Sequence, residues 1–187
     1  MKPFLVIPAY NEEKTILKVI KSSKKYISDI VVVDDCSSDN TYKLAIKTGV
    51  NVIKLNENVG YDKALEFGFA FALRSGATSI ISFDADGQHP YDRIIKMINL
   101  VEIDKFDLVI GVRSQLPRIS ERLFSFLTNI RFSINDITCG MKCYQSDLFA
   151  KFKFSRNYDS TGTYLTLVSI KNGYRFKKID IPIKKRS

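Results

Sequence analysis

The chain has no tryptophan, one histidine and three cysteines among its 187 residues. A structural zinc site takes four ligands that are mostly cysteine or histidine, so this inventory argues against one. The single histidine, His89, is the only possible base of a Ser-His-Asp triad, and we expect it to pack beside a site instead. Cys139 and Cys143 lack disulfide-like spacing and are predicted to be reduced, half-buried thiols on one face of a strand.

Several longer patterns are also missing. No apolar run approaches the roughly 20 residues of a membrane-spanning helix. No cationic segment precedes a long apolar stretch as in a signal peptide, so we expect a cytoplasmic protein. No Gly-x-Gly-x-x-Gly follows the first apolar run, which argues against a Rossmann dinucleotide site. The absence of Gly-x-x-x-x-Gly-Lys-Ser/Thr excludes a P-loop nucleotidase.

The composition is that of an ordinary globular protein, with 45% hydrophobic and 26% charged residues. A chain of this length fits one domain, which we expect to span residues 1–187. The net charge of +9 favours an anionic partner, either a nucleic acid, an acidic membrane surface or a phosphorylated ligand. A solvated basic surface would carry the same charge.

Short apolar runs alternate with amphipathic segments along the chain. This alternation predicts an α/β domain, with a mostly parallel sheet and helices on both faces. The expected strands are residues 4–7, 30–33, 52–55, 80–83, 108–110, 137–144 and 174–181. The expected helices are residues 12–25 (capped by Asn11), a segment opened by residues 37–40 and ending near 49, 61–74, 91–103, 118–134 and 161–170.

Polar groups follow three of the expected strands directly. Ligands of parallel sheets bind outside the carboxyl ends of the strands, so residues 8–12, 34–35 and 84–86 should meet at one edge. On a continuing strand Asp84 and Asp86 would point the same way. With Mg²⁺ or Mn²⁺ between them they would hold a diphosphate, and Gln88 could add a neutral oxygen. An ordinary surface turn is the alternative, since Asp and Gly are common in turns.

The other two polar segments fit a nucleoside. In Asp34-Asp35 one carboxylate can accept hydrogen bonds from a base or ribose, while the other caps the following helix. Pro8 is expected to end the first strand, and Tyr10 offers an aromatic surface for a base. Glu12 is either an acid in the first turn of a helix or a nucleotide contact.

These motifs, taken in order, resemble the family 2 glycosyltransferases, which have the Rossmann-like GT-A fold. The nearest subgroup is the dolichyl- and polyprenyl-phosphate sugar synthases. The likeness covers essentially the whole chain. Each motif alone is weak evidence for the family, but the full set of motifs in this order is highly specific. It is carried by residues 7–12, 32–41, 58–60, 83–90, 111–113, 136–140 and 181–187.

The resemblance implies roles for individual residues. Around the nucleoside it places Pro8, Tyr10, Glu12, Val33 and Asp35. On the sugar diphosphate it places Asp84, Ala85 and Asp86, with Mg²⁺ or Mn²⁺ held by Asp84, Asp86 and Gln88. The residues it makes catalytic are Asp86, Arg113, Asp136 and Arg186. The two arginines would face donor or acceptor phosphate, because guanidinium groups pair well with phosphate oxygens.

Two departures from the family pattern stand out. The pair Tyr61-Asp62 occupies a place where the family often has Lys-Gly, and Tyr164 stands where it often has an acidic residue. A sugar hydroxyl normally needs a general base, whereas a phosphate monoester is already anionic. The missing acid therefore favours a phosphate acceptor, although Asp136 or Asp159 could serve as a base.

The predicted function is inverting transfer of a sugar from GDP-mannose or a UDP-hexose to polyprenyl phosphate, on the cytoplasmic face of a membrane. The first alternative is transfer to a soluble or glycan hydroxyl. A second is a non-catalytic nucleotide- or nucleic-acid-binding module, and a third is a family member without activity; no nucleic acid is expected. The basic, aromatic segment 118–134 could lie in an anionic headgroup layer or cover the core. The resemblance also allows a membrane-anchoring partner protein.

Overall fold

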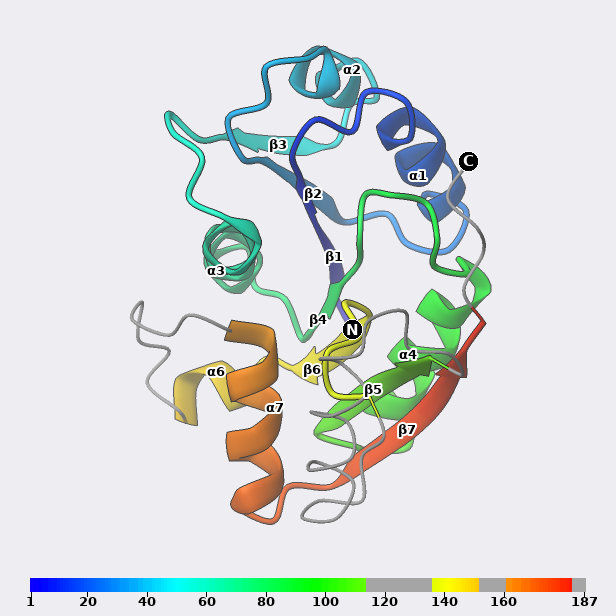
Figure 1. The fold of residues 1–187 in the computed structure, drawn as a ribbon. Helices are drawn as coiled ribbons and strands as arrows, with labels where there is room; N and C mark the ends of the chain where they lie inside the picture. The colour runs from blue at the N-terminus through cyan, green and yellow to red at the C-terminus, as the bar shows by residue number, and fades with distance from the viewer. Residues whose placement is uncertain (114–135, 152–160, 183–187) are drawn as a thin grey trace.

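A computed structural model describes residues 1–113, 136–151 and 161–182, and it contains one seven-stranded sheet (Figure 1). The strand order is β3-β2-β1-β4-β6-β5-β7. Strand β6 runs antiparallel to its neighbours β4 and β5, and the other strands share one direction. The strands are β1 (Pro3–Ala9), β2 (Ile30–Asp34), β3 (Asn51–Lys54), β4 (Ser79–Ser82), β5 (Leu108–Arg113), β6 (Lys142–Gln145) and β7 (Phe176–Ile181).

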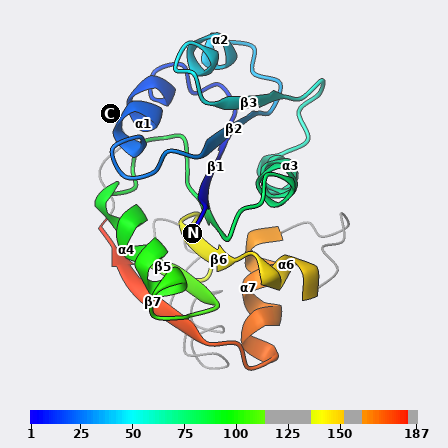
Figure 2. The same cartoon turned by 180° about the vertical axis from the view of Figure 1, so that it is seen from behind.

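Helices cover both faces of this sheet, as Figures 1 and 2 show from opposite sides. Helices α1 (Ile16–Ser23), α2 (Thr41–Ile46) and α4 (Asp92–Glu102) pack on one face. Helices α3 (Tyr61–Arg74), α6 (Asp147–Lys151) and α7 (Thr161–Lys171) pack on the other. The two apolar layers divide strand β1 by alternation: Leu5 and Ile7 face the first layer, Phe4 and Val6 the second. The predicted α/β architecture is confirmed.

Proline does not end the first strand, contrary to expectation. Strand β1 continues to Ala9, and Pro8 pairs with Val33 of β2. The N–H of Leu5 and the carbonyl of Ala9 form hydrogen bonds on the β2 side of the strand, whereas the carbonyl of Val6 accepts one on the β4 side. Pro8 therefore turns its missing N–H to the β4 side, beyond the last pair that β4 makes with β1, and no ladder hydrogen bond is lost.

The predicted start of the first helix is wrong. Helix α1 begins at Ile16 with Thr15 as its N-cap, and residues 13–15 form turns. Asn11 has φ +54°, and its Oδ1 accepts the backbone N–H of Ser38 at 2.9 Å. Its side chain thus joins the two loops that follow β1 and β2 instead of capping a helix.

The second half of the sheet departs most from expectation. The predicted strand 137–144 is shortened to β6, because residues 136–141 form an irregular approach to it. Helix α6 was not anticipated. Cys139 lies before the strand, and both it and Cys143 are fully buried rather than half-buried. Burial raises the pKa of the Cys139 thiol to about 12.

The described helices are all too short or too polar to cross a membrane. The predicted helix 118–134 lies outside the described residues. Strand β7 borders β5 at the edge of the sheet, and the apolar layer beneath α1 and α4 includes Leu5 from the first strand and Ile181 from the last. Both halves of the chain therefore contribute to one core.

Candidate active site

A cleft of about 610 Å³ opens at the carboxyl ends of β1, β2 and β4. Its volume lies within the usual range of small-molecule sites. The three polar segments that follow these strands all contribute to its walls, as the sheet topology predicted. The predicted residues that line it are Pro8, Tyr10, Glu12, Asp35, Asp84, Ala85, Asp86 and Arg113.

Asp35 joins the end of β2 to the start of α3. Its two carboxylate oxygens accept the backbone N–H groups of Val59 and Gly60 at 2.8 and 2.9 Å. Gly60 is the N-cap of α3 and has φ +88°, a conformation that side chains disfavour. Asp35 is 3% exposed but reaches the cleft wall, so it fixes the loop that forms one side of the site.

Asp34 does not cap the following helix in the expected way. Its Oδ2 accepts the backbone N–H of Ser37 at 3.3 Å, upstream of α2. The N-cap position of α2 is held by Asn40, which makes no capping hydrogen bond through its side chain. Asp39 instead accepts the N–H of Thr41 at 2.8 Å. Asp34 therefore shapes the turn after β2 and does not line the cleft.

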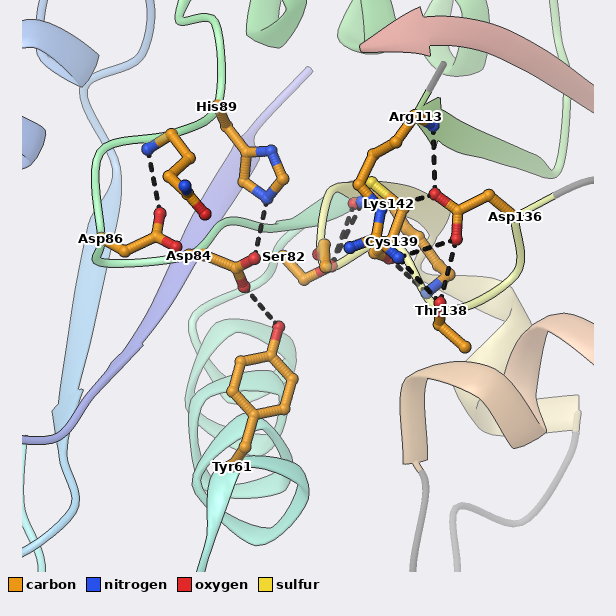
Figure 3. Close-up of polar contacts among 12 residues, drawn as sticks. Tyr61, Ser82, Asp84, Asp86, His89, Arg113, Asp136, Thr138, Cys139 and Lys142 are labelled. Carbon is orange, nitrogen blue, oxygen red and sulfur yellow. Dashed lines mark hydrogen bonds and ion pairs between the residues drawn. The ribbon is translucent and has the colours of Figure 1, made fainter. Parts of the chain in front are cut away.

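Two side chains hold the carboxylate of Asp84 (Figure 3). The hydroxyl of Tyr61, the first residue of α3, donates to Oδ1 at 2.7 Å. The Nε2 atom of His89 lies 2.8 Å from Oδ2. Enclosure of the hydroxyl and then the charge of Asp84 raise the pKa of Tyr61 well above its usual value. The pKa of Asp84 is lowered: burial opposes its ionisation, and the contacts with His89 and Tyr61 outweigh that effect.

A glycine from the second half of the chain makes room for this carboxylate. A Cβ atom on Gly140 would lie 2.3 Å from both oxygens of Asp84, far inside contact distance. The carbonyl of Gly140 also accepts the hydroxyl of Ser82, at the end of β4, at 2.6 Å. Residues 136–140 therefore meet residues 82–84 by backbone contact, which only a residue without a side chain permits.

Asp86 lies on a turn rather than on a continuing strand. Strand β4 ends at Ser82, and residues 85–86 form a turn, so the strand does not continue and gives no reason for Asp84 and Asp86 to point the same way. The Oδ1 atom of Asp86 accepts the N–H of Gln88 at 2.9 Å, a local bond that competes with strand geometry. Burial raises the pKa of Asp86, and the charges of Asp84 and Glu12 raise it further. The hydrogen bond from Gln88 lowers this pKa but does not outweigh those effects.

Arg113, at the end of β5, forms a two-point pair with Asp136. Its Nε donates to Oδ2 at 2.7 Å and its Nη2 to Oδ1 at 3.0 Å. The backbone N–H of Arg113 and the hydroxyl of Thr138 also donate to this carboxylate. Although burial opposes ionisation, the hydrogen bonds from Arg113 hold the pKa of Asp136 below its usual value. A carboxylate held this way is a poor proton acceptor, and the two-point pair fixes the orientation of the guanidinium.

The cleft is rich in negative charge. Among the described residues that line it are four carboxylates, from Glu12, Asp35, Asp84 and Asp86, and one cation, Arg113. A diphosphate entering such a cleft is repelled unless a positive ion accompanies it. The excess of negative charge therefore means that a diphosphate can be bound here only together with a cation.

Some predicted residues lie elsewhere. Val33 is fully buried against Leu55 and Ala64 and does not line the cleft. Gln88 contributes its backbone N–H to Asp86. Arg186 and Asp159 lie outside the described residues.

Sequence reasoning missed Tyr61, Gly140 and Lys142 as parts of the site. Tyr61 was noted only as a departure from the family pattern. Lys142 is 3% exposed and is the first residue of strand β6, where a lysine would ordinarily be expected to reach solvent. No local signal pointed to either, because Tyr61 bonds Asp84 from 23 residues away and Lys142 is brought beside Ser82 from 60 residues away along the chain.

Comparison with known proteins agrees with this geometry. The model of the family described as glycosyl transferase family 2 matches residues 4–149. The UDP-N-acetylglucosamine–dolichyl-phosphate N-acetylglucosaminyltransferase of Methanococcus voltae is 36% identical, with 62% of this chain and 53% of that protein covered. The polyprenol monophosphomannose synthase of Mycolicibacterium smegmatis is 27% identical, with 97% and 76% covered.

A solved structure shares the fold. Glucosyl-3-phosphoglycerate synthase from Mycobacterium tuberculosis, in complex with Mn²⁺ and UDP-glucose, matches with a TM-score of 0.80 at 16% identity. The match covers 100% of this chain and 71% of that one. With the fold, the cleft and the family model in agreement, this chain belongs to glycosyl transferase family 2 and has the GT-A fold.

Proposed function

We propose that this chain transfers a sugar from a nucleoside diphosphate to polyprenyl phosphate, with inversion at the anomeric carbon. The observation that carries the proposal is the cleft itself. Its lining combines an aromatic side chain, that of Tyr10, with the carboxylates of Asp84 and Asp86. Such a cleft suits a ligand with a base at one end and a diphosphate at the other.

The donor would lie along this cleft. Tyr10 is 49% exposed and offers its ring to the base, while Glu12 and Asp35 offer oxygens to ribose or base. The loop of residues 58–60, fixed by Asp35, closes one side. Both GDP-mannose and UDP-hexoses satisfy these features. The relatives named above include one whose name specifies a UDP-sugar and one that is a mannose synthase.

The donor set in the cleft fits a hard divalent cation. No cluster of three or more His, Cys, Asp or Glu side chains within residues 1–113, 136–151 and 161–182 could hold a metal by itself. Mg²⁺ is typically held by one or two carboxylates together with substrate phosphates, which matches Asp86 and Asp84. We propose that these two residues, with Gln88, hold Mg²⁺ or Mn²⁺, which would compensate the charge of the leaving diphosphate.

A phosphate acceptor needs no proton acceptor from the protein. An oxygen of the lipid phosphate attacks the anomeric carbon and forms the new C–O bond. The bond from that carbon to the diphosphate breaks, and its electron pair leaves with the nucleoside diphosphate. Arg113 lines the cleft and would face phosphate, with Asp136 fixing its orientation. Arg186 is proposed for the same task. Of the relatives named above, one has dolichyl phosphate in its name and another is a polyprenol monophosphomannose synthase, which supports a lipid-phosphate acceptor.

The acceptor distinguishes this proposal from its nearest rival. Transfer to a soluble or glycan hydroxyl requires a general base. Asp136, the described candidate, is held as a carboxylate by Arg113 and has no exposed side-chain area. This pairing favours the phosphate acceptor.

We also propose that the chain works at the cytoplasmic face of a membrane as a peripheral protein. The net charge of +9 supports attraction to anionic lipid. Liposome flotation tests this point: binding to anionic vesicles at low salt should weaken as salt is added. A folded protein that stays in solution with anionic vesicles at low salt would contradict it.

A donor and acceptor panel tests the chemistry. The protein is incubated with GDP-mannose, UDP-glucose or UDP-N-acetylglucosamine, with Mn²⁺ or with EDTA, and with either undecaprenyl phosphate or free sugars. We expect a lipid-linked product from one donor only when Mn²⁺ is present. Transfer to a free sugar but not to lipid phosphate would support the rival. Tight binding to RNA without metal, and no turnover, would support a nucleic-acid-binding module instead.

A further inference from the structure

A second, smaller chamber of about 190 Å³ opens beside the cleft. The two cavities share three residues, Tyr61, Thr138 and Gly140. Two of these contact Asp84: Tyr61 donates to its carboxylate, and Gly140 packs against it. The chamber therefore meets the cleft at the end assigned to the diphosphate. It is too small for a nucleotide.

One wall of the chamber holds a buried ammonium group. Lys142 is 3% exposed, and its Nζ donates to the carbonyl of Cys139 at 2.6 Å. An ammonium carries three N–H bonds, and in the described part of the chain no second acceptor lies within hydrogen-bonding distance. Buried donors without acceptors are costly, so the chamber is suited to a polar occupant that offers oxygens to Lys142.

A carboxylate stands near this ammonium. Asp62, the second residue of α3, lines the chamber and faces both Lys142 and the backbone N–H groups of Thr161 and Gly162 at the start of α7. Burial raises the pKa of Asp62, although these neighbours act in the opposite direction. The chamber thus offers a strong donor and a strong acceptor, and the hydroxyl of Thr163 adds a group that can be either.

The balance of charge argues against a phosphate here. The charges of three carboxylates, those of Asp136, Asp84 and Asp62, act on Lys142 without forming an ion pair with it among the described residues, and Asp136 is itself paired with Arg113 (Figure 3 shows Asp136 and Asp84). Among the described residues that line the chamber, Lys142 is the one cation and Asp62 the one carboxylate, so the lining has no net positive charge to hold a phosphate group. A neutral ring with several hydroxyl groups needs no such charge, because each hydroxyl both donates and accepts.

We propose that this chamber receives the sugar ring of the donor, and that Asp62 and Lys142 determine which sugar is accepted. The inference rests on the glycosyl transfer proposed above. In a nucleoside diphosphate sugar the ring is bonded directly to the terminal phosphate. The ring must therefore lie next to the groups that hold the diphosphate, and the chamber opens beside Asp84.

A single methyl group tests the chamber without disturbing the fold. A Cβ atom on Gly162 would lie 3.6 Å from the hydroxyl of Tyr144 and 3.9 Å from Nζ of Lys142, which is ordinary contact. Gly162→Ala therefore narrows the chamber beside the ammonium. Because alanine favours helix over glycine, the melting temperature should stay the same or rise.

The measurement compares ligands with and without the sugar. Dissociation constants are determined with Mn²⁺ for UDP and GDP, and for UDP-glucose, UDP-N-acetylglucosamine and GDP-mannose. In Gly162→Ala we expect unchanged affinity for the bare nucleotide, and affinity for the preferred sugar nucleotide on the order of tenfold weaker. Asp62→Asn keeps the size of the side chain but removes its charge, and should change the kcat/KM ratio between two sugars by on the order of tenfold.

The control is Lys171→Ala, an exposed site at the far end of the same helix, which should change neither ratio. If Gly162→Ala and Asp62→Asn are folded and keep the wild-type ratio of sugar-nucleotide to nucleotide affinity and the wild-type sugar preference, the chamber proposal is wrong and the transferase proposal stands. If the wild-type protein binds neither UDP nor GDP, both proposals fail.

Discussion

The site combines residues from the first half of the chain, up to about residue 112, with residues from the second half, from Arg113 onwards. The two groups are held mainly by different kinds of interaction. In the first half, two carboxylates accept backbone N–H groups, Asp35 from residues 59–60 and Asp86 from Gln88, while the side chains of Tyr61 and His89 hold Asp84. In the second half, buried charged side chains act on one another: Arg113 pairs with Asp136, and the charges of three carboxylates act on Lys142. The first arrangement is fixed by loops, the second by long-range packing of buried charge.

This difference predicts unequal responses to mutation. A carboxylate that accepts backbone N–H groups leaves only neutral donors behind when it is removed. A buried ion pair leaves an uncompensated charge when one partner is removed, which costs about 3–5 kcal/mol. Breaking the Arg113–Asp136 pair should therefore lower stability as well as turnover, whereas loss of Asp86 should act mainly on turnover.

The largest effect should come from Arg113→Met. It leaves Asp136, whose side chain has no exposed area, without its guanidinium partner. We expect the free energy of unfolding to fall by about 3 kcal/mol or more, measured by urea denaturation near neutral pH. Arg113→Lys keeps the charge but loses the two-point geometry. Its stability should therefore lie between those of the wild type and Arg113→Met, and its turnover should still be impaired. If the wild type, Arg113→Met and Arg113→Lys are equally stable, the buried ion pair does not contribute to stability as proposed.

Asp86→Ala should abolish turnover with little change in stability. The loss of a proposed metal ligand leaves the diphosphate charge uncompensated, so we expect kcat/KM to fall on the order of a hundredfold or more. Excess EDTA should have the same effect on the wild-type protein, and added Mn²⁺ should reverse it. Full activity in EDTA would overturn the metal assignment.

Gly140→Ala tests the contact between the halves. The new Cβ would lie 2.3 Å from the oxygens of Asp84, so that carboxylate must move away from Tyr61 and His89. We expect a loss of kcat/KM on the order of tenfold, because small displacements at a reacting centre are expensive. Tyr61→Phe, which removes only one of the hydrogen bonds to Asp84, is the milder companion variant. A fully active Gly140→Ala would show that Asp84 need not be held where it is.

The Arg113–Asp136 pair should also appear in the dependence of stability on pH. The pKa of Asp136 is lower in the folded protein than its usual value of 3.8. Its contribution to stability is therefore present above that value and is lost as the pH falls through the folded pKa. Between about pH 6 and about pH 3 the wild-type protein should lose more stability than Asp136→Asn, measured by thermal unfolding. Parallel curves would contradict the assignment.

The smallest effect concerns the three thiols. Cys36 is partly exposed, whereas Cys139 and Cys143 are fully buried with raised pKa values. Thiolate is the reactive form, so iodoacetamide should label the native protein once, at Cys36, and three times after unfolding. Labelling of Cys143 in the native state would indicate opening of the second half of the sheet.

The sequence by itself determined the alternation of strands and helices, the parallel first half of the sheet, and the edge where Tyr10, Asp35 and Asp84 meet. These features were predictable because periodicity and strand ends are local properties of the chain. Fully buried strands such as β2 appear as continuous β-branched runs, and the carboxyl ends of parallel strands necessarily share one edge.

Only the tertiary structure decided how the charges are held. The antiparallel insertion of β6 brings residues 136–142 against β4 and β5, and so places Gly140 on Asp84 and Lys142 where the charges of three carboxylates act on it. Pro8 lies within β1 because β4 stops short of it. Each of these outcomes depends on which segment lies next to which, and a local sequence pattern contains no information about a neighbour that is dozens of residues away.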